Sequence, residues 1–139
     1  MPDRDILLAK AGSIRRAIGR IRDVTRLNPD SLDDINTQDI FVLNLQRAIQ
    51  SAIDLAAHIV ASEGLGLPDS IKANFQLLQD GKLISKELTA KLQAMAGFRN
   101  IAIHEYQEID VAVLKSILIR HLKDLEDFCT SILQRFQNA

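Results

Sequence analysis

The sequence predicts an all-α fold, an up-down bundle of four to five helices, and three observations lead to it. Long stretches repeat apolar residues at spacings of three and four, which is the spacing of one helix face. The chain is 47% hydrophobic but only 4% aromatic and has no tryptophan, so aliphatic residues that favour helices must fill the core. Three prolines and six glycines leave only short connections. The 139 residues suit a single domain covering 1–139.

The first two predicted helices are long and are separated by a proline. The first covers residues 5–27, and Pro29 ends it because proline disfavours helical geometry at the preceding residue. A short linker, 31–37, leads to the second helix, 39–63, and Gly64 is its expected left-handed cap. The apolar face of the first helix consists of Leu7, Ala11, Ile14, Ile18 and Ile21.

Three more helices are predicted in the second half of the chain. A short one covers 69–79 and ends at the turn signal Asp80-Gly81. The fourth is capped by Ser85 and runs to about Arg99, and the fifth is capped by Asp110 and runs to about Phe136. The stretch between these two helices, 100–109, is expected to be a connection.

Composition excludes several classes of protein. A formal net charge of −1 argues against binding of duplex DNA by charge alone. Cys129 is the only cysteine, so we expect no internal disulfide and no cysteine-based zinc site. The N-terminus lacks the apolar core of a signal peptide, and no run of about 18 apolar residues could span a membrane. We therefore expect a cytoplasmic protein without membrane contact.

The chemistry of the chain is concentrated at the predicted end of the fourth helix. Arg99 and His104 are five positions apart, and Tyr106 follows two later. If the helix ends between Arg99 and His104, the three polar groups can fold toward one spot, with Ile101 and Ile103 anchoring the turn in the core. A guanidinium binds phosphate oxygens, and an imidazole with a pKa of about 6.5 moves protons. RNA supplies its own nucleophile, the 2′-hydroxyl, so an RNase needs no further group and no metal.

The same residues also have ordinary structural interpretations. Arg99 could stabilise the end of its helix, where cations are favoured, and His104 could be a hydrogen-bonded turn residue. Tyr106 could be partly buried with its hydroxyl at the surface. Asp54 and His58 share a face of the second helix and predict a local hydrogen bond, or else a contact that supports the 99–106 segment from behind. No third ligand is spaced to make them a metal site.

Two further sets of polar residues are expected to lie at the solvent-exposed surface. His121 is expected to be a solvated or interface residue. The first helix has a basic character that could contact RNA or the acidic surface of a partner, although a solvated face is the default. Its arginines are Arg15, Arg16, Arg20, Arg22 and Arg26.

The pattern of arginine, four residues, histidine, any residue and tyrosine at Arg99–Tyr106 resembles the signature of HEPN-domain RNases. The surrounding segments 54–60, 64–68, 97–106 and 109–110 resemble the HepT-like branch of that family. The order of long helix, glycine-proline turn, short helix, motif and long helix carries the resemblance over nearly the whole chain.

This resemblance implies a metal-independent endoribonuclease toxin of a toxin–antitoxin system, without a cofactor. Carried over, Arg99 and His104 are catalytic, Asn100 supports the site, and Tyr106 orients the RNA and is the target of AMPylation. The partner implied is an MntA-like minimal nucleotidyltransferase antitoxin. Homodimers with the two motifs facing across a cleft, and a larger complex with the antitoxin, are also implied. An AMP group would add bulk and negative charge beside Arg99 and His104 and repel RNA.

Two other classes of function remain open from the sequence. The chain could be a non-catalytic nucleotide- or partner-binding module, or a purely structural dimerisation bundle. His104 distinguishes the first of these from an RNase, because proton transfer requires its imidazole whereas binding could tolerate a hydrogen-bonding substitute.

Overall fold

The computed structural model describes residues 2–137, and these residues are helical with no strand. The prediction of an all-α fold is confirmed. No helix in this part of the chain has both the length and the apolar character needed to cross a membrane. The elements in order are α1 (Arg4–Thr25), the 3-10 helix η1 (Pro29–Asp33), α2 (Ile35–Ser62), α3 (Ile71–Asp80), α4 (Lys86–His104), the 3-10 helix η2 (Tyr106–Glu108), α5 (Val111–Arg120) and α6 (Leu122–Phe136).

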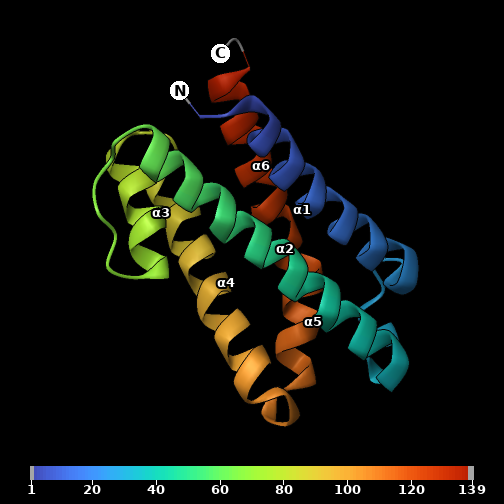
Figure 1. Cartoon of the computed structure of the whole chain (residues 1–139). Helices are drawn as coiled ribbons and strands as arrows, with labels where there is room; N and C mark the ends of the chain where they lie inside the picture. Colours follow the sequence, from blue (N-terminus) through green and yellow to red (C-terminus); the bar gives the residue numbers. More distant parts are fainter. Residues whose placement is uncertain (1, 138–139) are drawn as a thin grey trace.

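The helices form an up-down bundle in which α1 and α2 run side by side and cross in front of α4 and α6 (Figure 1). The start of α1 and the end of α6 lie at the same end of the bundle, and the turn after α4 lies at the other end. Aliphatic side chains fill the core, as the composition predicts. Two aromatic rings join them, because Phe75 of α3 meets Phe128 of α6 edge to face with centroids 5.9 Å apart.

Local sequence signals explain most helix starts. The side chains of Asp3, Asp34, Ser70, Ser85 and Asp110 each accept a hydrogen bond from a backbone N–H in the first turn of the following helix. Each such cap typically stabilises a helix by about 1 kcal/mol. The predicted caps at Ser85 and Asp110 are thus confirmed. Gly64, at φ +62°, also has the predicted left-handed conformation after α2.

Two helix boundaries differ from the prediction. Helix α4 continues to His104 instead of ending near Arg99, and the backbone N–H of Glu105 still bonds to the Ile101 carbonyl at 2.7 Å. The predicted fifth helix is divided at His121 into α5 and α6. There the His121 ring nitrogen lies 2.9 Å from the buried carboxylate of Asp124. The His121 side chain is 39% exposed, so it contacts solvent, as predicted, and is also the partner of a core acid.

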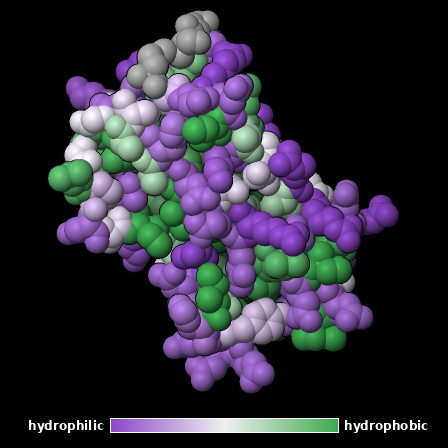
Figure 2. Space-filling view, viewed as in Figure 1, coloured by the Kyte–Doolittle hydropathy of each residue, from purple (hydrophilic) through white to green (hydrophobic). Residues whose placement is uncertain are grey.

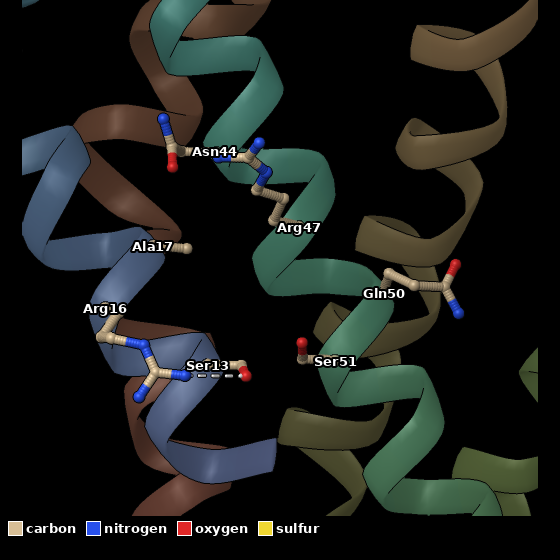
Figure 3. A pocket seen from close by; sticks show the side chains of 7 residues that line it. All are labelled: Ser13, Arg16, Ala17, Asn44, Arg47, Gln50 and Ser51. Atoms are coloured by element: carbon tan, nitrogen blue, oxygen red, sulfur yellow. Dashed lines mark hydrogen bonds between the residues drawn. The ribbon is translucent and has the colours of Figure 1, made fainter. Parts of the chain in front are cut away.

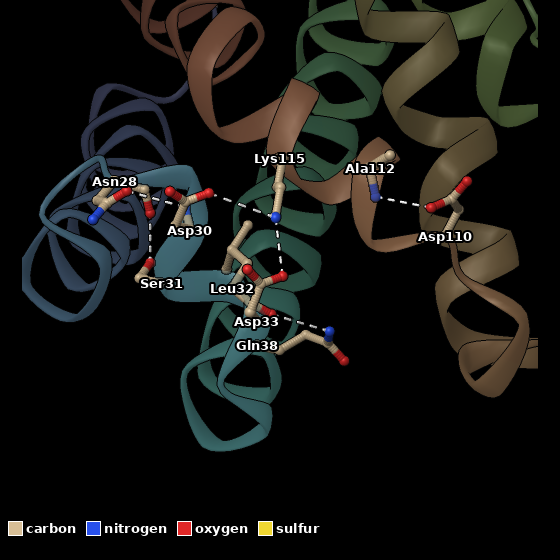
Figure 4. Close-up of polar contacts among 9 residues, drawn as sticks. All are labelled: Asn28, Asp30, Ser31, Leu32, Asp33, Gln38, Asp110, Ala112 and Lys115. Atoms are coloured by element: carbon tan, nitrogen blue, oxygen red, sulfur yellow. Dashed lines mark hydrogen bonds and ion pairs between the residues drawn. The ribbon is translucent and has the colours of Figure 1, made fainter.

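The predicted linker 31–37 is partly ordered as η1, and this short helix packs against α5. The Lys115 ammonium lies 2.9 Å from Asp33 Oδ1 and 3.7 Å from Asp30 Oδ1 (Figure 4). These carboxylates, first of all the hydrogen bond to Asp33, raise the pKa of Lys115. Leu32 is fully buried beneath them. The ion pairs of Lys115 attach α5 to η1, which immediately precedes α2. They thereby also hold the connection between α4 and α5 near the start of α2.

Candidate active site

The four motif residues lie where α4 ends and η2 begins, at the lower end of the bundle in Figure 1. Arg99 and Asn100 are in the second-last turn of α4, and His104 is its last residue. Tyr106 is the first residue of η2. Because α4 is continuous, five residues turn His104 by about 140° around the helix relative to Arg99. The helix therefore does not end between Arg99 and His104, which was the condition under which the three polar groups would fold toward one spot.

Arg99 and His104 differ in their surroundings. Arg99 is half-buried and its Nη1 donates a hydrogen bond to Asn100 Oδ1 at 3.0 Å. This contact orients the guanidinium from the neighbouring residue, so Asn100 positions Arg99. His104 is exposed, and among the described residues its side chain makes no hydrogen bond or ion pair. An imidazole at such a position is free to approach a ligand from solvent.

Tyr106 is fixed by a residue that the sequence pattern did not single out. Its hydroxyl donates a hydrogen bond to Asp39 Oδ1, in the second turn of α2. Burial, the hydrogen bond and the negative charge of Asp39 together raise the pKa of Tyr106 to about 12. Sixty-seven positions separate the two residues, so no local spacing signals the contact.

The apolar residues of the motif segment are placed differently from the expectation. Ile101 and Ile103 are each 48% exposed, whereas Ala102 between them is buried. The reason is the extra length of α4: in a continuous helix Ala102 occupies the inward face, and its neighbours turn outward. The two isoleucines therefore present apolar surface next to Arg99 and His104 instead of anchoring a turn in the core.

Asp54 and His58 contact α1, the residue that caps it and a neighbour on α2, but not the motif. Asp54 accepts from Gln50 at 2.8 Å and pairs with Lys10 at 3.2 Å. His58 Nε2 accepts from the backbone N–H of Asp3 at 3.0 Å. The predicted hydrogen bond between Asp54 and His58 is wrong, since each binds another partner. In the described part of the chain, no group of three His, Cys, Asp or Glu side chains is arranged to bind a metal ion.

Comparison with known proteins gives a consistent result. The family described as ribonuclease HepT-like matches residues 14–132. The mRNA nuclease HepT of Shewanella oneidensis is 39% identical over 124 residues, covering 89% of this chain and 93% of that protein.

Solved structures match the fold over almost the full length. A tri-AMPylated Shewanella oneidensis HEPN toxin in complex with its MNT antitoxin is 37% identical with a TM-score of 0.89, covering 95% of this chain and 99% of that one. The cytosolic protein YutE of Bacillus subtilis, at 15% identity and a TM-score of 0.85, shares the fold alone, over 99% of this chain and 92% of that one. With its all-helical bundle and the Arg99–Tyr106 motif at the end of α4, the chain belongs to the ribonuclease HepT-like family.

Proposed function

We propose that this chain is the RNase toxin of a toxin–antitoxin pair and that a minimal nucleotidyltransferase of the MNT type is its antitoxin. The observation that carries the proposal is the end of α4, where Arg99, Asn100 and His104 stand at the surface and Tyr106 follows in η2. The relatives add to it, because one is named an mRNA nuclease and another is an AMPylated toxin bound to its antitoxin.

The proposed chemistry uses the RNA's own 2′-hydroxyl as the nucleophile. Its oxygen attacks the adjacent phosphorus, the bond from phosphorus to the 5′-oxygen breaks, and a 2′,3′-cyclic phosphate forms. His104 moves the proton between these oxygens, since an imidazole can exchange protons near neutral pH. Arg99 binds the phosphate and stabilises the charge that develops on it. Asn100 orients Arg99 through the 3.0 Å hydrogen bond.

A homodimer is part of the proposal. Arg99 and His104 diverge around α4 within one chain, so a second copy facing the same helix end would bring further groups to the same phosphate. The half-exposed Ile101 and Ile103 give that helix end the apolar surface that dimer interfaces use.

Tyr106 is the proposed site of control by the antitoxin. Transfer of AMP to the phenolic oxygen would add a phosphate beside Arg99 and His104. That group would occupy the space of the RNA phosphate and repel RNA by its charge.

Growth and cleavage measured together test this proposal. The wild-type chain, Arg99→Ala and His104→Ala are induced without a partner, and Arg135→Ala is the control, because Arg135 is also exposed but lies on α6. We expect wild type and control to arrest growth and cut RNA on a gel, and the two motif variants to do neither while keeping the helical circular dichroism of wild type. Cleavage by His104→Ala would contradict its role. Four harmless, folded proteins would favour a non-catalytic binding module.

A further inference from the structure

A cleft between α1 and α2 is lined by two arginines that have no acidic partner in residues 2–137. It has a volume of about 450 Å³ and is lined by Ser13, Arg16, Ala17, Asn44, Arg47, Gln50 and Ser51 (Figure 3). Ser13 and Ser51 point toward each other across it, whereas the side chain of Gln50 turns away from α1. Seen from the front, strongly hydrophilic side chains gather over the part of the surface where α1 and α2 run side by side (Figure 2).

Along the contact between α1 and α2, a region with an ion pair is followed by a region in which positive side chains have no acidic partner among the described residues. At one end, Lys10 of α1 pairs with Asp54 of α2 at 3.2 Å. The helices are antiparallel, so six positions later on α1 and seven earlier on α2 the walls carry Arg16 and Arg47. Neither arginine forms an ion pair with a described residue, and Arg16 has only a 3.3 Å hydrogen bond to Ser13 Oγ.

No carboxylate is near enough in sequence to neutralise the two arginines. Helix α1 has no acidic residue between Asp5 and Asp23, and α2 has none between Asp39 and Asp54. The two guanidinium groups therefore leave the cleft with positive charge that no carboxylate of the lining balances, and such a site attracts anions. Hydroxyl groups from Ser13 and Ser51 at the same cleft add neutral hydrogen-bond donors. This set of donors fits a phosphate, which accepts several hydrogen bonds at once and which guanidinium groups bind in forked geometry.

The cleft is also placed to extend the motif site. Asp39, which binds Tyr106, and Arg47 lie on the same helix, eight residues or about 12 Å apart along its axis. The α2 surface between them contains no acidic side chain. A few nucleotides of extended RNA span that length.

We infer that the cleft between α1 and α2 is a second phosphate-binding subsite, in which Arg16 and Arg47 bind the backbone of single-stranded RNA away from the bond that is cut. The inference rests on the proposed RNase function. It assigns the two arginines to binding and not to catalysis. Their loss should therefore weaken the binding of long RNA and leave the rate of the chemical step unchanged.

The test compares Arg16→Gln/Arg47→Gln with the charge-matched control Lys123→Gln/Arg135→Gln, whose residues are exposed on α6 and form no ion pair with a described residue. The probe is a fluorescent 2′-O-methyl oligouridylate, which has no free 2′-hydroxyl and reports binding alone. We expect the cleft variant to bind at least about tenfold more weakly at low salt, and its slope of log affinity against log salt to be smaller by about 1.4, the value for two lost single-strand phosphate contacts. The control is expected to bind like wild type.

Cleavage of unmodified RNA separates this inference from the proposed function. For a long RNA, the cleft variant should show a raised KM and an unchanged kcat, whereas a dinucleotide too short to reach the cleft should be cut equally by all proteins. Weakened binding without any cleavage by wild type would leave the subsite standing and remove the RNase function. Unchanged binding and salt slope in the cleft variant would overturn the subsite. The subsite would also be overturned if the cleft variant bound RNA normally but no longer formed a complex with the nucleotidyltransferase. That result would assign the cleft to an acidic protein partner.

Discussion

The hydroxyl of Tyr106 donates its hydrogen bond to Asp39, and this contact joins the motif to the start of α2 across 67 positions of sequence. Tyr106 is the only tyrosine and the chain has no tryptophan, so the absorbance of phenolate reports this one residue. Burial first, and then the hydrogen bond to Asp39 and its negative charge, disfavour ionisation of the phenol and raise the pKa of Tyr106 to about 12.

Asp39→Asn should lower the pKa of Tyr106 toward its ordinary value, because the neutral amide removes the negative charge while keeping a hydrogen-bond acceptor. Spectroscopic titration of the folded wild type should give a midpoint near pH 12. The chain unfolded in denaturant is the reference and should titrate near pH 10. Equal midpoints in wild type and Asp39→Asn would contradict the contact.

The same shift predicts how stability depends on alkaline pH. The folded pKa of Tyr106 lies above the unfolded one, so its contribution is fully present below about pH 10. It decreases as pH rises toward 12, since only the unfolded chain loses the proton easily in that range. Urea midpoints measured from pH 9 upward should therefore fall more steeply for wild type than for Tyr106→Phe.

Incubation with the nucleotidyltransferase partner and ATP should add the mass of AMP to the peptide that carries Tyr106. The phenolic oxygen is the acceptor, so Tyr106→Phe should gain no mass under the same conditions. Mass spectrometry of the digested chain locates the group. A modified Tyr106→Phe chain would move the site to another residue.

The edge-to-face contact of Phe75 and Phe128 predicts a large effect of truncation in the core. Phe128 is fully buried, and Phe128→Ala should reduce the free energy of unfolding by about 3–5 kcal/mol, through lost burial and the cavity that remains. Phe98→Ala is the matched control, because Phe98 is only partly buried and should cost less. Urea unfolding followed by circular dichroism measures both, and equal costs would contradict the packing.

Gly19→Ala should stabilise the chain, because a methyl group there meets no atom within 4 Å and alanine loses less backbone entropy in a helix. The expected gain is about 0.5–1 kcal/mol in urea unfolding. Gly12→Ala is the instructive comparison, since its methyl group would lie 3.2 Å from Nη1 of Arg16. It should gain similar stability but shift the Arg16 guanidinium, and so weaken binding of the oligouridylate. A destabilising Gly19→Ala would be the contrary result.

Local signals predicted most of the fold. The side chains of Ser85 and Asp110 act within one turn of the residues they cap, so their roles were readable from the sequence. The end of α4 was not readable, because no proline or glycine stops the helix after Arg99. At the break, His121 and Lys91 of α4 both contact the buried carboxylate of Asp124, and the Lys91 contact, at 3.7 Å, joins residues far apart in the sequence.

The sequence predicts the candidate site as a set of residues but not as an arrangement. The assignment of Arg99, Asn100, His104 and Tyr106 rests on their spacing in the sequence and stays a prediction. Asp39 was missed because its link to Tyr106 exists only in the folded chain. The sequence indicates Arg16 only as part of the basic first helix and does not single out Arg47, because their placement at one cleft depends on the register of α1 against α2.

A phenol has one hydrogen, and in this fold Tyr106 gives it to Asp39. Once the phenolic oxygen carries an AMP group, that hydrogen is gone and the oxygen can no longer donate. The carboxylate would then face a phosphate diester of its own sign instead of a donor. A chain modified at Tyr106 therefore loses the hydrogen bond between η2 and α2, so the modification would both cover the site and remove this contact.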